Sequence, residues 1–228
     1  MTYILTPPAT PSLPISGDTR RFPVRRIFCI GRNYADHARE MGATVDRGKP
    51  VFFTKPTDAL VSDGNDVPYP PATSNLHHEV EMVVALGGGG RDIDPASASE
   101  LVFGHAVGLD LTRRDLQADA KQRGMPWDAA KGMDHGAPVS AIVPVAVGKP
   151  EADTQLSLHV NGELRQRSRL GAMLWSVPEI ICGLSQLFEL KPGDLIFTGT
   201  PAGVAALEPG DQFHAELAGL ATLDGCIR

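Results

Sequence analysis

Two glutamates separated by one residue, Glu79 and Glu81, open a run of β-forming apolar residues that continues to Leu86 and closes on four glycines. Side chains on a strand alternate between its faces, so both carboxylates share one face and lie roughly 6.5–7 Å apart along the backbone. Two like charges that enter a buried strand destabilise it unless a cation or hydrogen-bond donors meet them. The pair therefore indicates a divalent-cation site, and the alternative is a strand whose first half is solvated.

A third acidic residue, Asp110, lies near the end of another apolar run, residues 102–111, which reads as a second strand. With Glu79 and Glu81 it would give an all-oxygen ligand set, which favours Mg²⁺ or Mn²⁺ and leaves Ca²⁺ as a further option. The alternative is a carboxylate that backbone N–H groups satisfy at the start of the following helix. His77 shares the parity of the two glutamates and could support the ligands.

His37 and Glu40 lie three residues apart in a short predicted helix, with Asn33 as its N-cap and Gly42 at its end. Side chains at this spacing share a helical face, and a carboxylate beside an imidazole can orient and activate a general base. The alternative is a surface pair on a polar helix. A helix of this length is marginal alone, so we expect residues 32–50 to be mobile without ligand.

Cationic side chains occur in the same segments as the candidate metal ligands and the candidate base, or in similar apolar segments, although the chain has a net charge of −6. Arg114 and Gln117 lie three residues apart on a predicted helix and share a face. Thr200 belongs to a turn that could offer backbone N–H groups and a hydroxyl to an anionic ligand. A metal beside cations suggests a substrate that carries carboxylates. The cationic residues are Arg32, Lys55, Arg114 and Lys131.

The composition describes one acidic domain rich in turns. A chain of 228 residues, 42% of them hydrophobic, can build one sizeable core, and 24 glycines with 19 prolines favour short strands. The negative charge argues against nucleic acid and anionic membrane surfaces as partners. The sequence contains no apolar run long enough to span a bilayer and no signal-peptide pattern at its start. Its three cysteines fit neither a zinc spacing nor a disulfide framework, which indicates the cytoplasm.

Local patterns place the elements. Apolar runs predict strands at 26–31, 51–56, 77–86, 102–111 and 195–201. Residues 156–160 alternate and lead into Asn161-Gly162, a hairpin turn. Ser176 and Glu179 form a capping box that opens a helix. Five prolines in residues 1–23 predict an extended N-terminal arm, which leaves 24–228 as a single catalytic domain.

Six ordered motifs resemble the fumarylacetoacetate hydrolase family from about residue 24 onward. They are Gly31-Arg32-Asn33-Tyr34-Ala35-x-His37, Phe53-x-Lys55-Pro56, His77-His78-Glu79-x-Glu81, Asp110-x-Thr112-x-Arg114-Asp115-x-Gln117, Lys131 and Thr198-Gly199-Thr200-Pro201. The resemblance implies an α+β fold, a mixed β-sandwich roll with short peripheral helices. It also implies a Mg²⁺ site and a homodimer. Met133 departs from the phenylalanine usual in the family, so the pocket wall could differ.

The resemblance also implies roles for the residues, matched motif by motif. It makes Glu79, Glu81 and Asp110 the metal ligands and His37 with Glu40 the base that activates water. The remaining residues would hold and polarise a small 2-oxo acid or dicarboxylate, with Lys131 stabilising the departing enolate. They are Arg32, Lys55, Arg114, Gln117, Lys131 and Thr200.

The implied reaction is hydrolysis of the C–C bond of an acylpyruvate. Fumarylpyruvate, cleaved to fumarate and pyruvate during aromatic degradation through gentisate, is the first choice. Oxaloacetate decarboxylation and 2-oxo acid isomerisation are the alternatives within the family. A non-catalytic dicarboxylate- or Ca²⁺-binding protein is an alternative of another class, and it would need no base such as the His37–Glu40 pair.

Overall fold

The structure is a computed structural model that describes residues 3–40, 42, 47–62 and 64–228. Its strands are β1 (Ser12–Ile15), β2 (Asp18–Pro23), β3 (Arg26–Gly31), β4 (Val51–Lys55), β5 (Leu60–Val61), β6 (Leu76–His77), β7 (Val80–Leu86), β8 (Val102–Leu109), β9 (Thr112–Arg113), β10 (Ala137–Pro138), β11 (Val143–Pro144), β12 (Gln155–Val160), β13 (Glu163–Arg169), β14 (Asp194–Phe197), β15 (Ala206–Leu207), β16 (Gln212–Leu217) and β17 (Ala221–Cys226). The α-helices are α1 (Ala35–Glu40), α2 (Pro95–Ala98), α3 (Arg114–Arg123), α4 (Asp128–Lys131) and α5 (Val177–Leu187).

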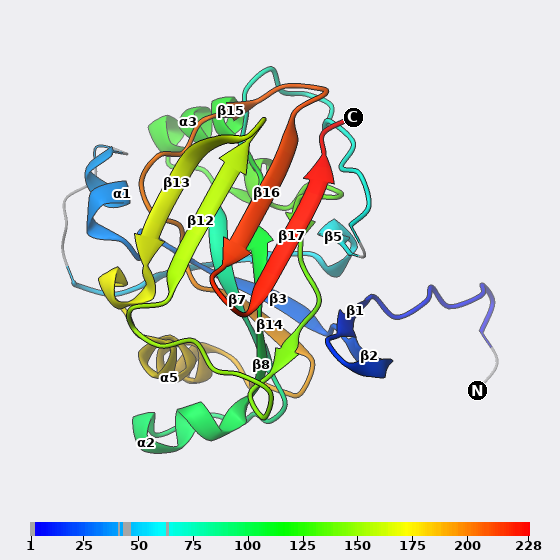
Figure 1. The fold of residues 1–228 in the computed structure, drawn as a ribbon, viewed down its shortest axis with the longest axis vertical. Coiled ribbons are helices and arrows are strands. Elements are labelled where there is room, and N and C mark those ends of the chain that lie inside the picture. The colour runs from blue at the N-terminus through cyan, green and yellow to red at the C-terminus, as the bar shows by residue number, and fades with distance from the viewer. Residues whose placement is uncertain (1–2, 41, 43–46, 63) are drawn as a thin grey trace.

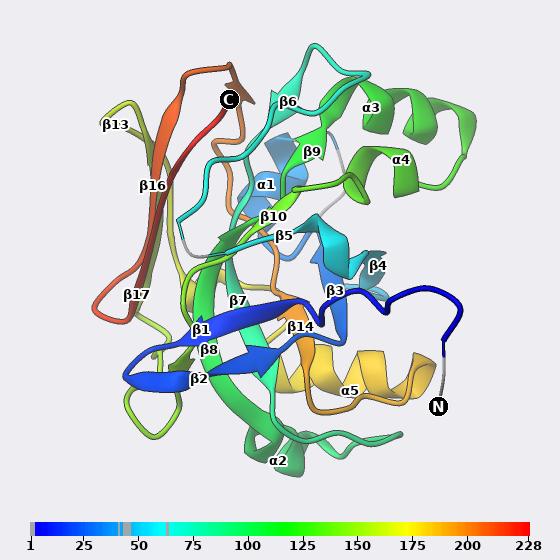
Figure 2. The same cartoon turned by 90° about the vertical axis from the view of Figure 1, so that its right-hand side faces the viewer.

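Two larger sheets form the body of the molecule. A six-stranded mixed sheet has the order β11-β8-β7-β14-β3-β4, in which β14 and β3 are parallel. A four-stranded antiparallel sheet, β13-β12-β16-β17, faces it, as Figures 1 and 2 show from two sides. The short helices lie around the sheets. This arrangement confirms the predicted α+β class, a mixed β-sandwich roll with short peripheral helices.

Strand β7 is buried along its whole length, as its two apolar faces predicted. Val80, Met82 and Val84 belong to the core cluster that also contains Leu156 and Leu158 of the four-stranded sheet. The alternate residues Val83 and Ala85 belong to a second cluster on the opposite face of the six-stranded sheet. Glu81 shares the parity of that second face, and Glu79 immediately precedes the strand with the same parity, so both carboxylates lie away from the core between the sheets.

The N-terminal arm is only partly extended. Residues 12–23, predicted as part of that arm, form the antiparallel hairpin β1–β2, in which Leu13 pairs with Phe22. Both side chains are buried in the second cluster, and the Phe22 ring stacks on Phe103 with 5.2 Å between centroids. The prolines misled the prediction because an edge strand tolerates proline, and the buried apolar pair supplies the stabilisation. The predicted domain start at residue 24 follows β2.

Two local predictions are confirmed. Strands β12 and β13 form a hairpin whose turn residues Asn161 and Gly162 have φ of 53° and 79°, as a type I′ turn requires. The backbone N–H and Oγ of Ser176 donate to Glu179 Oε2 at 2.8 and 2.7 Å, which caps α5. Among the described residues, none of the helices combines the length and apolarity that a membrane crossing requires.

Candidate metal centre and active site

The pairing of β7 with β8 brings the three predicted acidic ligands together. Val80 lies opposite Leu109, and the backbone N–H of Asp110 donates to the Glu79 carbonyl at 2.8 Å. Each of Glu79, Glu81 and Asp110 offers a carboxylate oxygen, and these atoms lie within 4.8 Å of one another. Their exposed fractions are 5%, 2% and 0%. Two of the predicted ligands lie close together in the sequence, and the pairing of β7 with β8 brings the third beside them.

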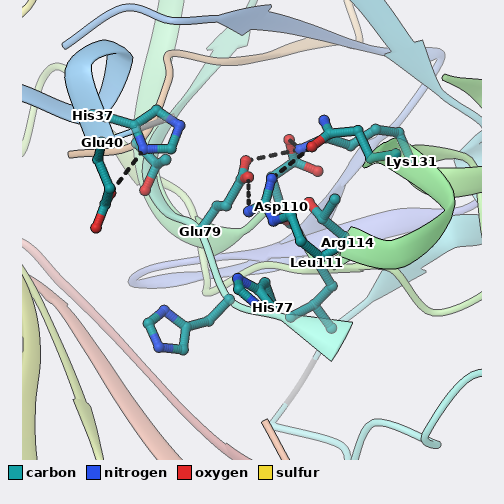
Figure 3. A network of polar contacts seen from close by, with 12 residues as sticks. His37, Glu40, His77, Glu79, Asp110, Leu111, Arg114 and Lys131 are labelled. Atoms are coloured by element: carbon teal, nitrogen blue, oxygen red, sulfur yellow. Dashed lines mark hydrogen bonds and ion pairs between the residues drawn. The ribbon is translucent and has the colours of Figure 1, made fainter. Parts of the chain in front are cut away.

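Three buried cations neutralise this cluster, as Figure 3 shows in part. Lys131 Nζ bridges two of the acids, at 2.8 Å from Glu79 Oε2 and 2.6 Å from Asp110 Oδ2. Arg114 Nη2 donates to Glu79 Oε1 at 2.6 Å, and its Nη1 donates to Gln117 Oε1 at 2.6 Å. Lys55 Nζ lies 2.8 Å from Asp110 Oδ1. Within the described part of the chain, these three cations contact Glu79 and Asp110, and none of them pairs with Glu81.

Glu81 is the least neutralised of the three acids. Its one hydrogen bond within the described residues comes from the backbone N–H of Gly199, 2.6 Å from Oε2. Burial, followed by the charges of Asp110 and Glu79, raises the pKa of Glu81 well above its ordinary value. Burial alone would also raise the pKa of Glu79, but the charges of Lys131 and Arg114 outweigh it and lower that pKa. Negative charge at Glu81 therefore lacks a full partner.

The donor set fits a divalent metal ion. Asp110 Oδ1 is buried and lies 2.8 Å from Lys55 Nζ, whose ammonium also donates to the carbonyls of Leu111 and Lys131, at 3.0 and 2.6 Å. Glu81 has no cationic partner among the described residues, and a hard cation with oxygen ligands would supply the missing positive charge. Glu79, Glu81 and Asp110 would hold such an ion.

Helix α1 places the predicted base at the edge of the same site. His37 Nδ1 lies 3.4 Å from Glu40 Oε2, a long contact, and His37 is buried (Figure 3). Burial is the main cause that lowers the pKa of His37, so the ring is neutral at pH 7 and can accept a proton. The backbone N–H of Gly203 donates to both Glu40 oxygens, at 3.1 and 3.2 Å. The loop after Thr200 thus orients the carboxylate that orients the imidazole.

A small cavity of about 30 Å³ joins these groups. Every predicted site residue except Glu40 and Lys55 lines it. The lining comprises Ile30, Gly31, Arg32, His37, Phe53, Glu79, Glu81, Asp110, Arg114, Gln117, Lys121, Trp127, Lys131 and Thr200. Glu40 lies behind His37, and the side chain of Lys55 is fully buried against Asp110. A direct contact between Lys55 and substrate stays a prediction.

His77 lies outside this cavity, although its parity suggested a supporting role. Its Nε2 lies 2.9 Å from Asn75 Oδ1, and its half-buried ring is not part of the lining. Burial, and then the charge of Arg114, lower the pKa of His77 to about 4. The ring therefore stays neutral near the acids, and support of the ligands by His77 remains a prediction.

Two aromatic side chains form a wall of the cavity: Phe53, which belongs to the Phe53-x-Lys55-Pro56 motif, and Trp127, which belongs to none of the motifs. The Phe53 and Trp127 rings meet edge to face, with 6.0 Å between centroids. Lys131 Nζ lies 5.0 Å from the Phe53 centroid, and Lys121 Nζ lies 5.5 Å from that of Trp127. Met133, where the motif departs from its relatives, is buried in the core cluster and does not line the cavity.

Gln166 connects the four-stranded sheet to the site. Its Oε1 accepts from the Val80 N–H at 3.0 Å and lies 2.9 Å from His78 Nδ1. Its Nε2 donates to Thr200 Oγ1 at 2.9 Å and to the Pro201 carbonyl at 2.8 Å. Thr200 Oγ1 in turn donates to the Val80 carbonyl at 2.8 Å. The neighbouring residues of the polar strand β13 gave no sign that Gln166 supports the site. Only its hydrogen bonds to Val80 and Thr200 in the folded structure show this.

Asn33 does not cap α1, contrary to the expectation. The helix begins at Ala35, and Asn33 is fully buried. Its Nδ2 donates to the carbonyls of Trp175 and Thr198 at 3.0 and 2.7 Å, and its Oδ1 accepts from the Trp175 N–H at 2.7 Å. These long-range bonds satisfy the amide more completely than a cap would. The predicted mobility of 32–50 falls partly on 41 and 43–46, outside the described residues.

Comparison with known proteins agrees with this geometry. The family described as fumarylacetoacetate (FAA) hydrolase, C-terminal, matches residues 26–228. The mitochondrial oxaloacetate tautomerase FAHD1 of Rattus norvegicus is 44% identical over 200 residues, 87% of this chain and 90% of that protein. Fumarylpyruvate hydrolase of Ralstonia sp. is 43% identical over 185 residues, 80% of this chain and 96% of that protein.

A solved structure is similar over nearly the whole chain. Fumarylpyruvate hydrolase from Pseudomonas aeruginosa, crystallised with Mn²⁺ and pyruvate, has a TM-score of 0.96 and 45% identity, and the match covers 99% of both chains. The present chain belongs to the fumarylacetoacetate hydrolase family. It is an enzyme of the hydrolase class that acts on carbon–carbon bonds, with an acidic site for a divalent metal.

Proposed function

We propose that this enzyme hydrolyses an acylpyruvate, with fumarylpyruvate cleaved to fumarate and pyruvate as the first choice. The observation that carries the proposal is the His37–Glu40 pair, whose imidazole lines the same cavity as the three acids. Addition of water needs such a base, whereas binding alone does not. The similarity to fumarylpyruvate hydrolases from Ralstonia and Pseudomonas aeruginosa supports the substrate.

The cationic lining suits a substrate with two carboxylates. Arg32, Arg114 and Lys121 line the cavity and can receive carboxylates through charge-assisted hydrogen bonds. Arg114 already engages Glu79 and Gln117, so its position is fixed before substrate enters. Arg32 lines the same cavity. We propose that its guanidinium binds the substrate carboxylate that lies far from the metal.

The metal we propose is Mg²⁺, with Mn²⁺ as a substitute, held by Glu79, Glu81 and Asp110. When bound, the ion would supply Lewis-acid stabilisation to the oxygens of a 2-oxo acid. Lys131 Nζ adds a positive charge beside the same carboxylates. Burial opposes that charge, but the charges of Asp110 and Glu79 outweigh burial and raise the pKa of Lys131, so it stays protonated during turnover.

The side chains would divide the reaction between them. Neutral His37, oriented by Glu40, takes a proton from water, and the hydroxide oxygen forms a bond to the distal carbonyl carbon. The bond between that carbon and the methylene of the pyruvate unit then breaks. Its electron pair passes to the methylene carbon as an enolate, and protonation there yields pyruvate. Lys131 is placed to stabilise the negative charge of the departing enolate.

A second candidate is chemistry on oxaloacetate without added water. The 44% identity with the rat oxaloacetate tautomerase supports it. Tautomerisation, decarboxylation and 2-oxo acid isomerisation use the same enolate-stabilising groups but need no attacking water. The buried acid cluster and Lys131 could support either hydrolysis or the chemistry on oxaloacetate. The experiment that separates the two must therefore change His37, the proposed base.

The deciding experiment compares substrates and one matched pair of variants. We would measure fumarate release from fumarylpyruvate, and keto–enol exchange and CO₂ release from oxaloacetate. His37→Ala should reduce fumarate release by about a hundredfold or more, as expected for loss of a general base. His214→Ala, on the partly exposed side of β16, is the control. If the wild-type enzyme handles oxaloacetate with a much higher kcat/KM, the hydrolase assignment is wrong.

We also propose a place in aromatic degradation through gentisate, a cytoplasmic location and a homodimer. The fumarylpyruvate hydrolase relatives support the pathway, and the free cysteines are compatible with the compartment. Sedimentation of the purified enzyme would test the dimer. Growth of a deletion strain on gentisate would test the pathway.

A further inference from the structure

A second cavity, of about 470 Å³, lies apart from the acid cluster. That volume falls in the range of about 300–1,000 Å³ typical of small-molecule sites. Met82, Val102, Val145, Leu170 and Met173 give it an apolar interior. It shares no lining residue with the acidic cavity. Its lining comes from β7, β8, the loop after β11, the segment around Leu170 and the start of α5.

One end of this cavity carries groups for an anion. His105 is 7% exposed, and its buried Nδ1 has no hydrogen-bond partner among the described residues. Burial, and then the charge of nearby Lys149, lower the pKa of His105 to about 4, so the ring is neutral at pH 7. Lys149 lines the rim and supplies positive charge, while Glu151 at the same rim disfavours a second anionic group.

The N-terminus of α5 forms another part of the lining. Ser176, Val177 and Pro178 line the cavity at the start of an eleven-residue helix, whose first turn is already capped by the Glu179 carboxylate. The apolar interior with one cationic end selects a small organic acid with one carboxylate and an apolar body. A buried polar nitrogen without a partner is what such a ligand would satisfy.

Two walls of the cavity are parts of the active-site framework. Met82 follows Glu81 on β7, and its carbonyl accepts from the N–H and Oγ1 of Thr198 at 3.1 and 2.8 Å. Met173 forms a β-bridge with Tyr34, the residue just before α1. A ligand in the cavity would therefore contact the neighbour of a metal-binding residue and the support of the helix that carries His37.

The same wall anchors both ends of the segment that contains α1. At its start, Asn33 bonds to the N–H and carbonyl of Trp175, and the Leu174 N–H donates to the Asn33 carbonyl at 2.7 Å. At its end, Arg47 Nε donates to the Leu174 carbonyl at 2.8 Å, and its guanidinium lies 5.0 Å from the Trp175 ring centroid. The residues on either side of this anchor, Met173 and Ser176, line the cavity.

We propose that this cavity is a second small-molecule site, for an organic monocarboxylate with an apolar body, and that its occupancy is coupled to the segment that carries His37 and Glu40. The carboxylate lies at the His105 and Lys149 end, and the apolar body contacts Met82 and Met173. The coupling passes through the anchor at Leu174 and Trp175.

Benzoate is the probe for binding, measured by calorimetry on the full-length enzyme with Mg²⁺ and oxalate present to occupy the acidic site. We expect saturable binding at one site per chain, and binding at least about tenfold weaker for benzyl alcohol, which lacks the charge. Lys149→Ala should weaken benzoate binding by a similar factor, while Lys191→Ala, the removal of another exposed lysine, should not. No saturable binding, or equal binding by the two lysine variants, would overturn the site.

His105→Phe removes the buried nitrogen and should also weaken benzoate binding. If His105→Phe does not fold, the comparison of Lys149→Ala with Lys191→Ala still tests the site. The coupling is tested by hydrogen exchange of residues 33–40, with and without benzoate. We expect benzoate to slow exchange there in the wild type and to have no effect on exchange in Lys149→Ala. Binding without any change in exchange would overturn the coupling. Neither readout depends on the reaction proposed above, so failure of one proposal is distinguishable from failure of the other.

Discussion

Lys131 Nζ lies 2.6 Å from Asp110 Oδ2, and the two residues are 21 positions apart in the chain. The ammonium also bridges to Glu79, so it holds together two of the three acids that fit a divalent ion. Lys131 thus supplies positive charge to the cluster whether or not a metal is bound. We therefore expect the stability of the acid cluster to depend both on the Lys131 ammonium and on a bound divalent ion.

Lys131→Met should make the enzyme more dependent on metal. The change removes one buried cationic partner from both Glu79 and Asp110, and breaking a buried pair typically destabilises by about 3–5 kcal/mol. We expect a lower melting temperature in EDTA and a larger increase on adding Mn²⁺ than the wild type shows. Thermal unfolding with and without MnCl₂ measures this, with Lys191→Met as the control. An equal metal-induced shift in both variants would contradict it.

Asp110→Asn and Glu81→Gln should both abolish metal binding but differ in stability. Asp110 lies beside two buried lysines, so its neutralisation removes the carboxylate partner of Lys55 and one of the two partners of Lys131, which destabilises by about 3–5 kcal/mol. Glu81 has a backbone donor and no cationic partner among the described ion pairs, so Glu81→Gln should unfold at or above the wild-type denaturant midpoint. Calorimetry with Mn²⁺ and urea unfolding in EDTA test both parts. Retained Mn²⁺ affinity in either variant would refute the ligand assignment.

The stability of the metal-free enzyme should depend on pH through Glu81. Its folded-state pKa is raised by burial and by the charges of Asp110 and Glu79, above an unfolded value of about 4.3. Its contribution to stability is therefore complete below the unfolded pKa and is lost as pH rises through the folded pKa. The stability of Glu81→Gln relative to wild type should increase over that interval. Urea unfolding at a series of pH values, with the exposed Glu163→Gln as control, should show it; a pH-independent difference would not fit.

Activity should persist below the ordinary titration range of histidine. Burial, which outweighs the nearby carboxylates, lowers the pKa of His37 below 6.5, so the ring remains an available base in mildly acidic solution. We expect the acidic limb of the kcat/KM profile to have its midpoint below pH 6.5. Fumarate release measured across the pH range tests this. A midpoint above 6.5 would show that another group, or a different state of His37, controls the rate.

Gly203→Ala should impair catalysis through Glu40. Gly203 has φ of 97°, and a Cβ there would lie 2.3 Å from the Arg165 carbonyl oxygen, so the loop that donates to Glu40 must move. Gly210 is a matched control because its φ is 99° and an added Cβ meets nothing within 4 Å. Both alanines carry backbone strain of about 1–3 kcal/mol, but only Gly203→Ala should lower kcat by more than about tenfold. Similar kcat values for the two variants would contradict an orienting role for this loop.

The sequence was most informative where local chemistry decides structure. The alternation in β7, the Asn161-Gly162 turn and the Ser176 capping box each depend on residues close in the chain. The acid cluster was also predictable, because buried carboxylates on neighbouring strands need a cation. These features follow from periodicity, burial and the chemistry of turns and caps.

Contacts between distant residues were not predictable from local patterns. Gln166 and Thr200 are 34 positions apart, and their hydrogen bond depends on how the two sheets face each other. Asparagine is a favoured N-cap residue, but the side-chain amide of Asn33 instead forms hydrogen bonds with the backbone of Trp175. The hairpin of residues 12–23 was missed because prolines signal irregular chain while the burial of Leu13 and Phe22 is decided by the core. In each case a long-range contact overrode a local preference.

Both ends of the segment from Asn33 to Arg47 are fastened to the same two neighbouring residues, Leu174 and Trp175. Because the ends are held together, the free energy of closing the loop depends only weakly on the length of chain between them. Each doubling of the length of a closed loop costs only about 0.6 kcal/mol. A change in chain length between Glu40 and Arg47 would therefore leave the strands that carry the acids with the same supports.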